Sequence, residues 1–366
     1  MRIGDVYAER SERGAEDMEL LSVTMNDGVK MRSDIEGKDN SSEDKSNYKI
    51  VRAGDMVYNS MRMWQGANGI SPWDGIVSPA YTVLKPRMLI SNGFFAALFK
   101  THRLINEFRK NSQGMTSDTW NLKYPQIETI KTCIPALVEQ EKIADFLMAL
   151  DQRIEKQRTL VEHLKKYKRG VSNTFFNDKV VAECSAVLPF GQAVEINPKT
   201  KSLPTEFIYI DLESVESGKL LQENIISRDN APSRAQRVLT KGDVLFQMVR
   251  PYQKNNFYFE SELSLPAVAS TGYAQIRCVD NDPLFVFEQI SSDYFANEAM
   301  LRSTGTGYPA INADSLAEIP FIKLPIEEQQ KIGKFLYLLS QRIIQEESKL
   351  DSLLKVKSAM LQSLFI

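Results

Sequence analysis

Apolar residues recur with alternating steps of four and three in two long segments of the chain. The positions in the first segment are Ile143, Leu147, Leu150, Ile154, Gln157, Val161, Leu164, Lys168, Val171 and Phe175. Those in the second are Ile332, Leu336, Leu339, Ile343, Glu346, Leu350, Leu353, Lys357, Met360 and Leu364. Eight of the ten positions are apolar in each segment, over more than four heptads. This pattern predicts two long coiled-coil helices.

The two helical segments are copies of one another. EQEKIADFLMALDQRI at 139–154 and EQQKIGKFLYLLSQRI at 328–343 match at 10 of 16 positions, 189 residues apart. A weaker likeness extends upstream, where VRAGDMVYNSMR at 51–62 corresponds to LTKGDVLFQMVR at 239–250. In each copy a Gly-Asp turn leads into a β-branched and aromatic run, which predicts a turn that enters a strand. The chain therefore predicts a duplicated plan of globular unit and helix.

The globular units combine short strands with a helical segment, at 94–111 in the first unit and at 283–301 in the second. A Ser/Thr/Gly-rich loop follows each, at 112–121 and at 303–312. This mixture is typical of an α+β fold. The predicted divisions are two similar globular units at 1–135 and 178–325, with one long helix after each, at 136–177 and 326–366.

Both helices break the heptad at equivalent points, Gln157 with Glu346 and Lys168 with Lys357. In one antiparallel register Gln157 faces Lys357 while Lys168 faces Glu346, whereas a parallel pair would place two lysines together. Polar pairs inside such a seam fix the register. The same register pairs Leu150 with Leu364, Ile154 with Met360, Val161 with Leu353, Leu164 with Leu350, Val171 with Ile343 and Phe175 with Leu339.

We therefore predict a pseudo-two-fold molecule in which an antiparallel helix pair holds the two globular units apart like a ruler. The alternative is that each amphipathic helix packs only on its own globular unit.

Composition excludes little beyond disorder and membrane insertion. The chain has 366 residues, a net charge of −2 and a pI near 6.0, so it lacks the overall basic excess of many nucleic-acid binders. Only a local patch has to be basic for such binding. The three cysteines, Cys133, Cys184 and Cys278, suggest no disulfide framework, and the N-terminus has no apolar signal core. We expect a cytoplasmic protein without a membrane span, whose cysteines are reduced and buried.

Motifs for catalysis are missing. The strings NDPL at 281–284 and SPWD at 71–74 lack the second proline and the aromatic of an Asn/Asp-Pro-Pro-aromatic methyltransferase motif, and GTGY at 305–308 precedes no clear helix. His102 and His163, the only histidines, are 61 residues apart, which disfavours a zinc or acid–base site. We expect no catalytic residues, no metal and no cofactor.

Each repeated helix has a proline-led entry, IPALVEQEKIADFL at 134–147 and LPIEEQQKIGKFL at 324–336. Three further strings are informative, INPK at 196–199, PSRAQRVLTKGDVLFQMVRPY at 232–252 and ERSERGAEDMELLSVT at 9–24. With these motifs the whole chain resembles a specificity subunit of a type I restriction-modification system; the helix entries carry the strongest likeness, and the three strings resemble parts of target recognition domains in that family. Unlike many relatives, this chain carries only Met1 and Arg2 before the first such domain, which we expect to weaken one partner contact.

The resemblance implies a non-catalytic reader of double-stranded DNA. Each target recognition domain would read one half of a bipartite sequence in the major groove, and the helix pair would set the spacer. Two modification subunits, which carry the methyl donor, would dock on the helices to form an adenine methyltransferase, and restriction subunits would complete the complex. A scaffold that docks partner subunits without reading DNA is the main alternative, and a self-sufficient enzyme is disfavoured by the missing motifs.

Candidate DNA contacts lie in polar loops that carry basic and aromatic residues beside predicted strands. Arg, Lys, Asn and Gln read base edges, whereas Lys, Arg and hydroxyl groups bind phosphates. In the first unit the candidates are Lys30, Arg32, Arg62, Trp64, Gln65, Thr116 and Ser117. In the second unit they are Arg250, Tyr252, Gln253, Lys254, Thr306 and Tyr308. Arg62 and Arg250 are the best pair because both copies keep them after the Gly-Asp turn; the alternative is an ion pair with Asp55 or Asp243.

A basic run at 165–170, KKYKRG, also fits DNA backbone, a partner's acidic face or a merely solvated helix face.

Overall fold

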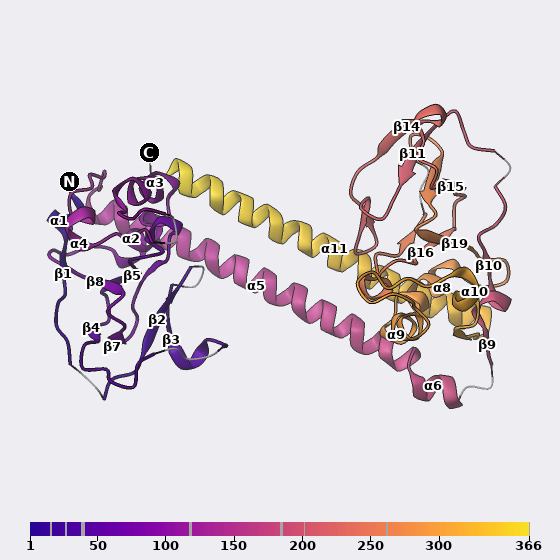
Figure 1. Ribbon diagram of the computed structural model, residues 1–366, viewed down its shortest axis with the longest axis horizontal. Coiled ribbons are helices and arrows are strands. Elements are labelled where there is room, and N and C mark those ends of the chain that lie inside the picture. Colours follow the sequence, from indigo (N-terminus) through magenta and orange to yellow (C-terminus); the bar gives the residue numbers. More distant parts are fainter. Residues whose placement is uncertain are drawn as a thin grey trace. The chain divides into compact units, whose positions relative to one another are not determined.

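A computed structural model describes residues 1–14, 17–25, 28–37, 41–116, 119–183, 186–200, 202–260 and 263–365. The chain divides into two compact units, each of which contains one globular domain and parts of both long helices. Unit 1 comprises Met1–Arg158 and Lys349–Ile366, and unit 2 comprises Thr159–Ser348. The long helices are α5 (Leu137–Phe175) and α11 (Ile326–Ser363). We call the part of unit 1 that precedes α5 domain 1, and the part of unit 2 between α5 and α11 domain 2 (Figure 1).

Domain 1 is built on the four-stranded antiparallel sheet β1-β8-β5-β6, with the additional ladders β2-β3 and β4-β7. Its elements in chain order are α1 (Ile3–Val6), β1 (Tyr7–Glu9), β2 (Leu21–Thr24), β3 (Gly28–Met31), η1 (Arg32–Asp34), β4 (Lys49–Val51), β5 (Met56–Asn59), η2 (Met63–Gln65), β6 (Asn68–Ile70), β7 (Gly75–Val77), β8 (Tyr81–Pro86), α2 (Asn92–Leu98), α3 (His102–Asn111) and α4 (Tyr124–Ile127). Phenylalanines of α2 and α3 pack on the sheet to form the main core.

Domain 2 repeats this plan. Its elements are α6 (Asp178–Glu183), β9 (Val187–Pro189), α7 (Phe190–Ala193), β10 (Glu195–Ile196), β11 (Glu206–Ile210), β12 (Val215–Glu216), β13 (Lys219–Leu220), β14 (Asn224–Ser227), η3 (Arg228–Asn230), β15 (Ala235–Val238), β16 (Val244–Gln247), η4 (Pro251–Gln253), β17 (Phe257–Tyr258), β18 (Ala267–Ser270), β19 (Tyr273–Arg277), α8 (Pro283–Ile290), α9 (Asp293–Leu301), α10 (Ala313–Ala317) and β20 (Pro320–Ile322). The sheet β10-β19-β16-β17 has the order of β1-β8-β5-β6, and the strands of a second sheet are ordered β14-β11-β18-β15.

The predicted α+β fold and the predicted Gly-Asp turns are confirmed. Gly54 and Gly242 both adopt a φ of 93°, a conformation that glycine reaches without a Cβ clash, and β5 or β16 begins two residues later. Tyr81 and Tyr273 are equivalent, since they pair with Asn59 on β5 and with Gln247 on β16.

Two sequence expectations are wrong in detail. Each predicted helical segment is two helices, because Thr101 and Ser292 cap a second helix through their side chains. Cys133 is exposed, since it lies in the connection that leads to α5, Cys278 is half-buried, and Cys184 lies outside the described residues.

The long helices run antiparallel inside each unit. In unit 1, Asp151 of α5 pairs with Lys357 of α11 at 2.5 Å, while Ile143 and Phe365 both pack on the core of domain 1. In unit 2, Lys165 pairs with Glu347 at 2.6 Å, while Val171 and Ile332 both pack on the core of domain 2. In each unit, therefore, α5 and α11 pack on the core of the same domain, and their chains run in opposite directions.

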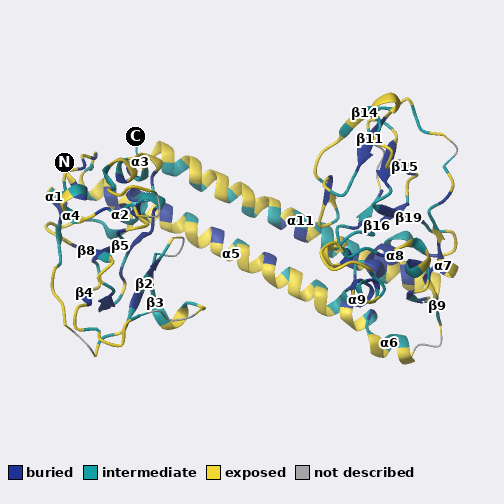
Figure 2. Cartoon of the chain, viewed as in Figure 1, coloured by how far each residue is buried: buried dark blue, intermediate teal, exposed yellow. Residues whose placement is uncertain are grey.

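Burial along α5 and α11 follows the predicted heptads. Leu147, Ile154, Val161, Leu336 and Ile343 are buried, and all other predicted seam positions except the exposed Leu364 are buried or half-buried. Exposed residues occupy most remaining positions of both helices (Figure 2). No helix in the described part of the chain combines the length and apolar character required to cross a membrane.

The predicted pairs across the seam, polar and apolar, stay a prediction. Both seam lysines have ion-pair partners besides the predicted ones: Lys168 pairs with Glu288 of α8 at 2.8 Å, and Lys357 pairs with Asp151 at 2.5 Å. Glu288, with a side chain only 1% exposed, is a buried acid of the globular domain that a comparison of the two helices alone does not include.

Candidate nucleic-acid interface

Two loops meet in equivalent places in the two domains. In domain 1, the Leu122 N–H donates to the Ser60 carbonyl at 2.9 Å, and in domain 2 the Ile311 N–H donates to the Met248 carbonyl at 3.0 Å. These bonds join the turn after β5 or β16 to the Ser/Thr/Gly-rich loop. We call residues 60–66 with 112–121 the paired loops of domain 1, and residues 248–254 with 303–312 the paired loops of domain 2.

Aromatic rings join the paired loops of domain 1. The Trp64 ring lies edge-on to the Trp120 ring, with 5.3 Å between centroids, and its Nε1 donates to the Met61 carbonyl. The Arg109 guanidinium lies 5.6 Å from the Trp120 centroid. Arg62 is exposed, and its guanidinium has no hydrogen-bond or ion-pair partner among the described residues. An exposed cation in a loop that also carries indole rings suits phosphate or base contact.

A hollow of about 470 Å³ lies beside Arg62 in domain 1. Arg32 also lines it, so the structure brings these two predicted candidates together. The Arg32 guanidinium donates to the Ile35 carbonyl at 2.7 Å and to the Gly37 carbonyl at 3.0 Å. Lys30 lies half-buried on β3 of the same hairpin. Polar groups thus surround a concave surface, although the Arg32 side chain also braces its own loop.

Domain 2 stacks its arginine on a tyrosine. Arg250 has a left-handed backbone, with φ 54° and ψ 59°, and its N–H donates to the Pro309 carbonyl at 2.7 Å. Its guanidinium lies over the Tyr308 ring at 4.2 Å, a cation–π contact. Tyr308 and Tyr252 are 70% and 52% exposed, so two aromatic rings face solvent beside this arginine. Gln253 accepts a hydrogen bond from Gln247 at 2.8 Å through its Oε1, and Thr306 is exposed in the facing loop.

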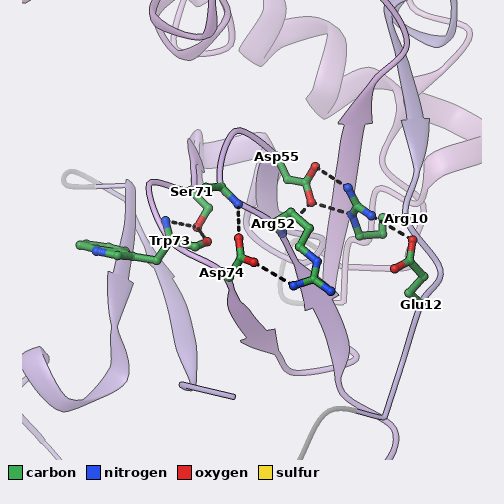
Figure 3. Close-up of polar contacts among 8 residues, drawn as sticks. Arg10, Glu12, Arg52, Asp55, Ser71, Trp73 and Asp74 are labelled. Carbon is green, nitrogen blue, oxygen red and sulfur yellow. Dashed lines mark hydrogen bonds and ion pairs between the residues drawn. The ribbon is translucent and has the colours of Figure 1, made fainter. Parts of the chain in front are cut away.

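The Gly-Asp turn that leads into β5 or β16, at the other end of the strand from the paired loops, contains a buried carboxylate. In domain 1, Arg10 donates to Asp55 through Nε at 2.7 Å and through Nη2 at 3.1 Å (Figure 3). In domain 2, Arg277 donates to Asp243 through Nε at 2.9 Å and through Nη2 at 2.8 Å. These hydrogen bonds raise the pKa of Arg10 and of Arg277.

The alternative assignment of Arg62 and Arg250, as structural partners of these aspartates, is therefore wrong. A neighbouring pair fixes the turn in domain 1, where Asp74 accepts from the Ala53 N–H at 2.9 Å and from Arg52 at 2.8 Å (Figure 3). Both bonds lower the pKa of Asp74.

The structure thus groups most predicted candidates. Arg62, Trp64, Gln65 and Thr116 lie in the paired loops of domain 1, whereas Ser117 lies outside the described residues. Arg250, Tyr252, Gln253, Lys254, Thr306 and Tyr308 lie in the paired loops of domain 2, although the Lys254 ammonium is bonded to Asp293. Sequence reasoning missed Trp120 and Arg109, although the tryptophan in SQGMTSDTWN was a usable signal. Among the described residues, no three His, Cys, Asp or Glu side chains are grouped to hold a metal ion.

Residues 23–165 match the family model of the type I restriction modification DNA specificity domain. A specificity subunit of the type I restriction enzyme MjaVIII from Methanocaldococcus jannaschii is 24% identical over 335 residues, which cover 84% of this chain and 75% of that protein. Residues 23–165 thus form a type I restriction modification DNA specificity domain, and the chain is similar to type I specificity subunits.

Two further comparisons agree with this likeness. The HindI specificity subunit from Haemophilus influenzae is 27% identical over 165 residues, which are 43% of this chain and 35% of that protein. The crystal structure of a type I restriction-modification S subunit from M. genitalium aligns with a TM-score of 0.60 at 16% identity, over 100% of this chain and 95% of that one. At such low identity the structural likeness concerns the fold, which is the two-domain α+β fold described above.

Proposed function

We propose that this specificity subunit reads a bipartite DNA sequence, with one half bound by the paired loops of each domain. The observation that carries this proposal is the repetition, at the same place in both folds, of an arginine in a loop that also carries aromatic residues. In domain 1 Arg62 comes two residues before Trp64, whose ring contacts that of Trp120, and in domain 2 Arg250 stacks on Tyr308. Arginine reads guanine edges and binds phosphates, and the flanking hydroxyl and amide side chains add further donors.

We further propose that α5 and α11 carry the partner subunits. Exposed apolar residues recur on the two helices 189 residues apart, as Phe146 with Phe335 and Tyr167 with Val356. Exposed apolar side chains of this size favour protein contacts. Two equivalent patches fit two copies of a modification subunit, which would bind the methyl donor and methylate adenine. A restriction subunit would add to that complex in the cytoplasm, and this chain would contribute no catalytic group.

The helix pair would also set the spacer between the two half-sites. The presence of antiparallel parts of the same two helices in each unit supports this proposal. Matched insertion of one heptad into α5 and α11 should lengthen the methylated spacer. An unchanged spacer would refute this role.

The test of sequence reading is methylome sequencing of a host that carries this chain with its modification partner. Arg62→Ala should relax or weaken recognition of one half-site and Arg250→Ala that of the other, each by about 1–3 kcal/mol in DNA affinity. Arg158→Ala is a matched control, because Arg158 is an exposed arginine of α5 that pairs with Glu155 one turn earlier in the same helix.

Replacement of residues 1–135 by another family member's domain should change one half-site only. If the arginine variants and the domain replacement left both half-sites unchanged, the reader proposal would be wrong.

A further inference from the structure

The paired loops of domain 2 contain a second residue with a left-handed backbone. Lys254, the C-cap of η4, has φ 53° and ψ 32°. The equivalent residue of domain 1 is Gly66, the C-cap of η2, with φ 88° and ψ 20°. Glycine adopts this conformation freely, whereas a residue with a Cβ does so at a cost. Domain 2 therefore has a lysine at a left-handed position where domain 1 has the unstrained glycine. This difference indicates that the lysine side chain has a role.

The Lys254 ammonium is held by a carboxylate. It donates to Asp293, the first residue of α9, and Arg169 of α5 donates to the other oxygen of the same carboxylate at 2.7 Å. The side chains of Lys254 and Asp293 are 29% and 31% exposed, so solvent screens this contact only in part. Burial opposes the charged form of Asp293, but the bonds from Lys254 and Arg169 outweigh it and lower the pKa of the carboxyl. All three residues belong to unit 2.

A comparison with domain 1 shows what this contact adds. Both domains fasten the chain just after the loop to the C-terminal end of α2 or α8 through an asparagine: Asn68 Nδ2 donates to the Phe99 carbonyl at 3.3 Å, and Asn256 Nδ2 donates to the Ile290 carbonyl at 3.2 Å. Domain 1 adds Lys100, which donates from the helix side to the Gly66 carbonyl at 2.6 Å. Domain 2 has the lysine on the loop and the acceptor on the helix, so the second fastening is reversed.

Asp293 also extends the connection beyond the domain core. Through Arg169 it contacts the basic run of α5, and Lys100 in domain 1 donates to the loop carbonyls of Met25 and Gly66. The chain Lys254–Asp293–Arg169 thus joins the paired loops of domain 2 to a long helix.

We propose that Asp293 is a positioning residue for sequence reading, which fixes the paired loops of domain 2 through Lys254 and ties them to α5 through Arg169. This inference rests on the proposed function. It also assigns Lys254 a role within the protein, rather than as a direct DNA contact.

The two roles of Lys254 predict opposite results for Asp293→Asn. If Asp293 positions the loop, loss of its charge should lower affinity for the complete site about tenfold and relax only the half-site read by domain 2. If Lys254 contacts DNA, the same variant releases its ammonium and affinity should stay equal or rise, which would overturn the inference. The measurement is binding by the assembled complex with modification subunits, on duplexes with either half-site scrambled, together with methylome sequencing.

Lys254→Gly separates positioning from folding. It removes the ion pair while relieving the left-handed strain, so half-site recognition should relax without loss of thermal stability. Lys254→Arg should restore recognition, and Asp293→Asn combined with Lys254→Gly should be no worse than either alone. Asp74→Asn, which removes a similar ion pair with Arg52 in domain 1, is the matched control and should leave the domain 2 half-site unchanged.

A purely structural Asp293 would lower the melting temperature but leave both half-sites intact, and this result would also overturn the inference. The proposed function fails separately, if the wild-type complex shows no bipartite site at all.

Discussion

Domain 1 and domain 2 share a sheet order but differ in the charged contacts of their Gly-Asp turns. The buried aspartate of the Gly-Asp turn is held in domain 1 by Arg10, which follows β1, and in domain 2 by Arg277 at the end of β19. The two arginines come from different strands, yet both place a guanidinium against the same carboxylate. Duplication has thus kept the backbone turn and the need to neutralise its acid, while the neutralising residue has moved.

The helix lysines show a similar divergence. Lys357 finds its acid on the facing long helix, at Asp151, whereas Lys168 finds it inside domain 2, at Glu288. Ser340, the equivalent of Asp151 in the second copy, donates to Glu288 at 3.0 Å. Domain 2 is therefore fastened to both long helices through one buried acid, and equivalent positions of the two copies serve different partners.

The largest effect that tests this comparison should come from the buried aspartates. Asp243 accepts hydrogen bonds from Thr240, Gln275 and Arg277, and its side chain is 1% exposed. Asp243→Asn should lower the stability of domain 2 by about 5 kcal/mol, because it leaves Arg277 and its neighbours without their charged acceptor. Asp55→Asn should cost domain 1 less, because Asp55 accepts only from Arg10 and the Arg52 N–H among the described residues.

Hydrogen exchange measures the two domains separately, through the amides of β16 and β5. Equal losses of protection in the two variants would contradict the idea that domain 2 depends more on its buried aspartate than domain 1 does.

A smaller effect should distinguish the two lysine contacts. Glu288→Gln removes the partner of Lys168 from a buried site and should cost about 3 kcal/mol. Asp151→Asn removes the partner of Lys357 where the acid is 52% exposed, and should cost no more than about 1 kcal/mol. Urea unfolding of the two variants provides the comparison. A similar shift of the transition for both would show that the two lysines are held equally strongly.

The heptad pattern and the duplication of the sequence predicted those structural features that recur in both halves of the chain. The heptads place the buried residues of α5 and α11, and the shared Gly-Asp turns locate β5 and β16, because these features recur in the local sequence. Charge partners were not predictable in this way. Glu288 and Asp293 look like ordinary helical acids in the sequence, and only tertiary packing brings them against Lys168 and Lys254. Arg62 and Arg250 were located by the repeat, but the Arg109–Trp120 contact joins segments without a shared motif.

The smallest effect concerns the C-cap of η2. Gly66 has φ 88°, and a Cβ at this position would lie 3.3 Å from the flexible Cδ1 of Ile105, so backbone strain matters more than space. Gly66→Ala should therefore lower the stability of domain 1 by about 1–2 kcal/mol, the usual cost of a left-handed alanine. Hydrogen exchange of the η2 amides should therefore become faster. Lys254→Gly in domain 2 places glycine at a left-handed position, so its effect on the backbone should not make exchange of the η4 amides faster. If Lys254→Gly lowered stability as much as Gly66→Ala does, the side-chain contact to Asp293 would matter more than the backbone conformation at the C-cap of η4.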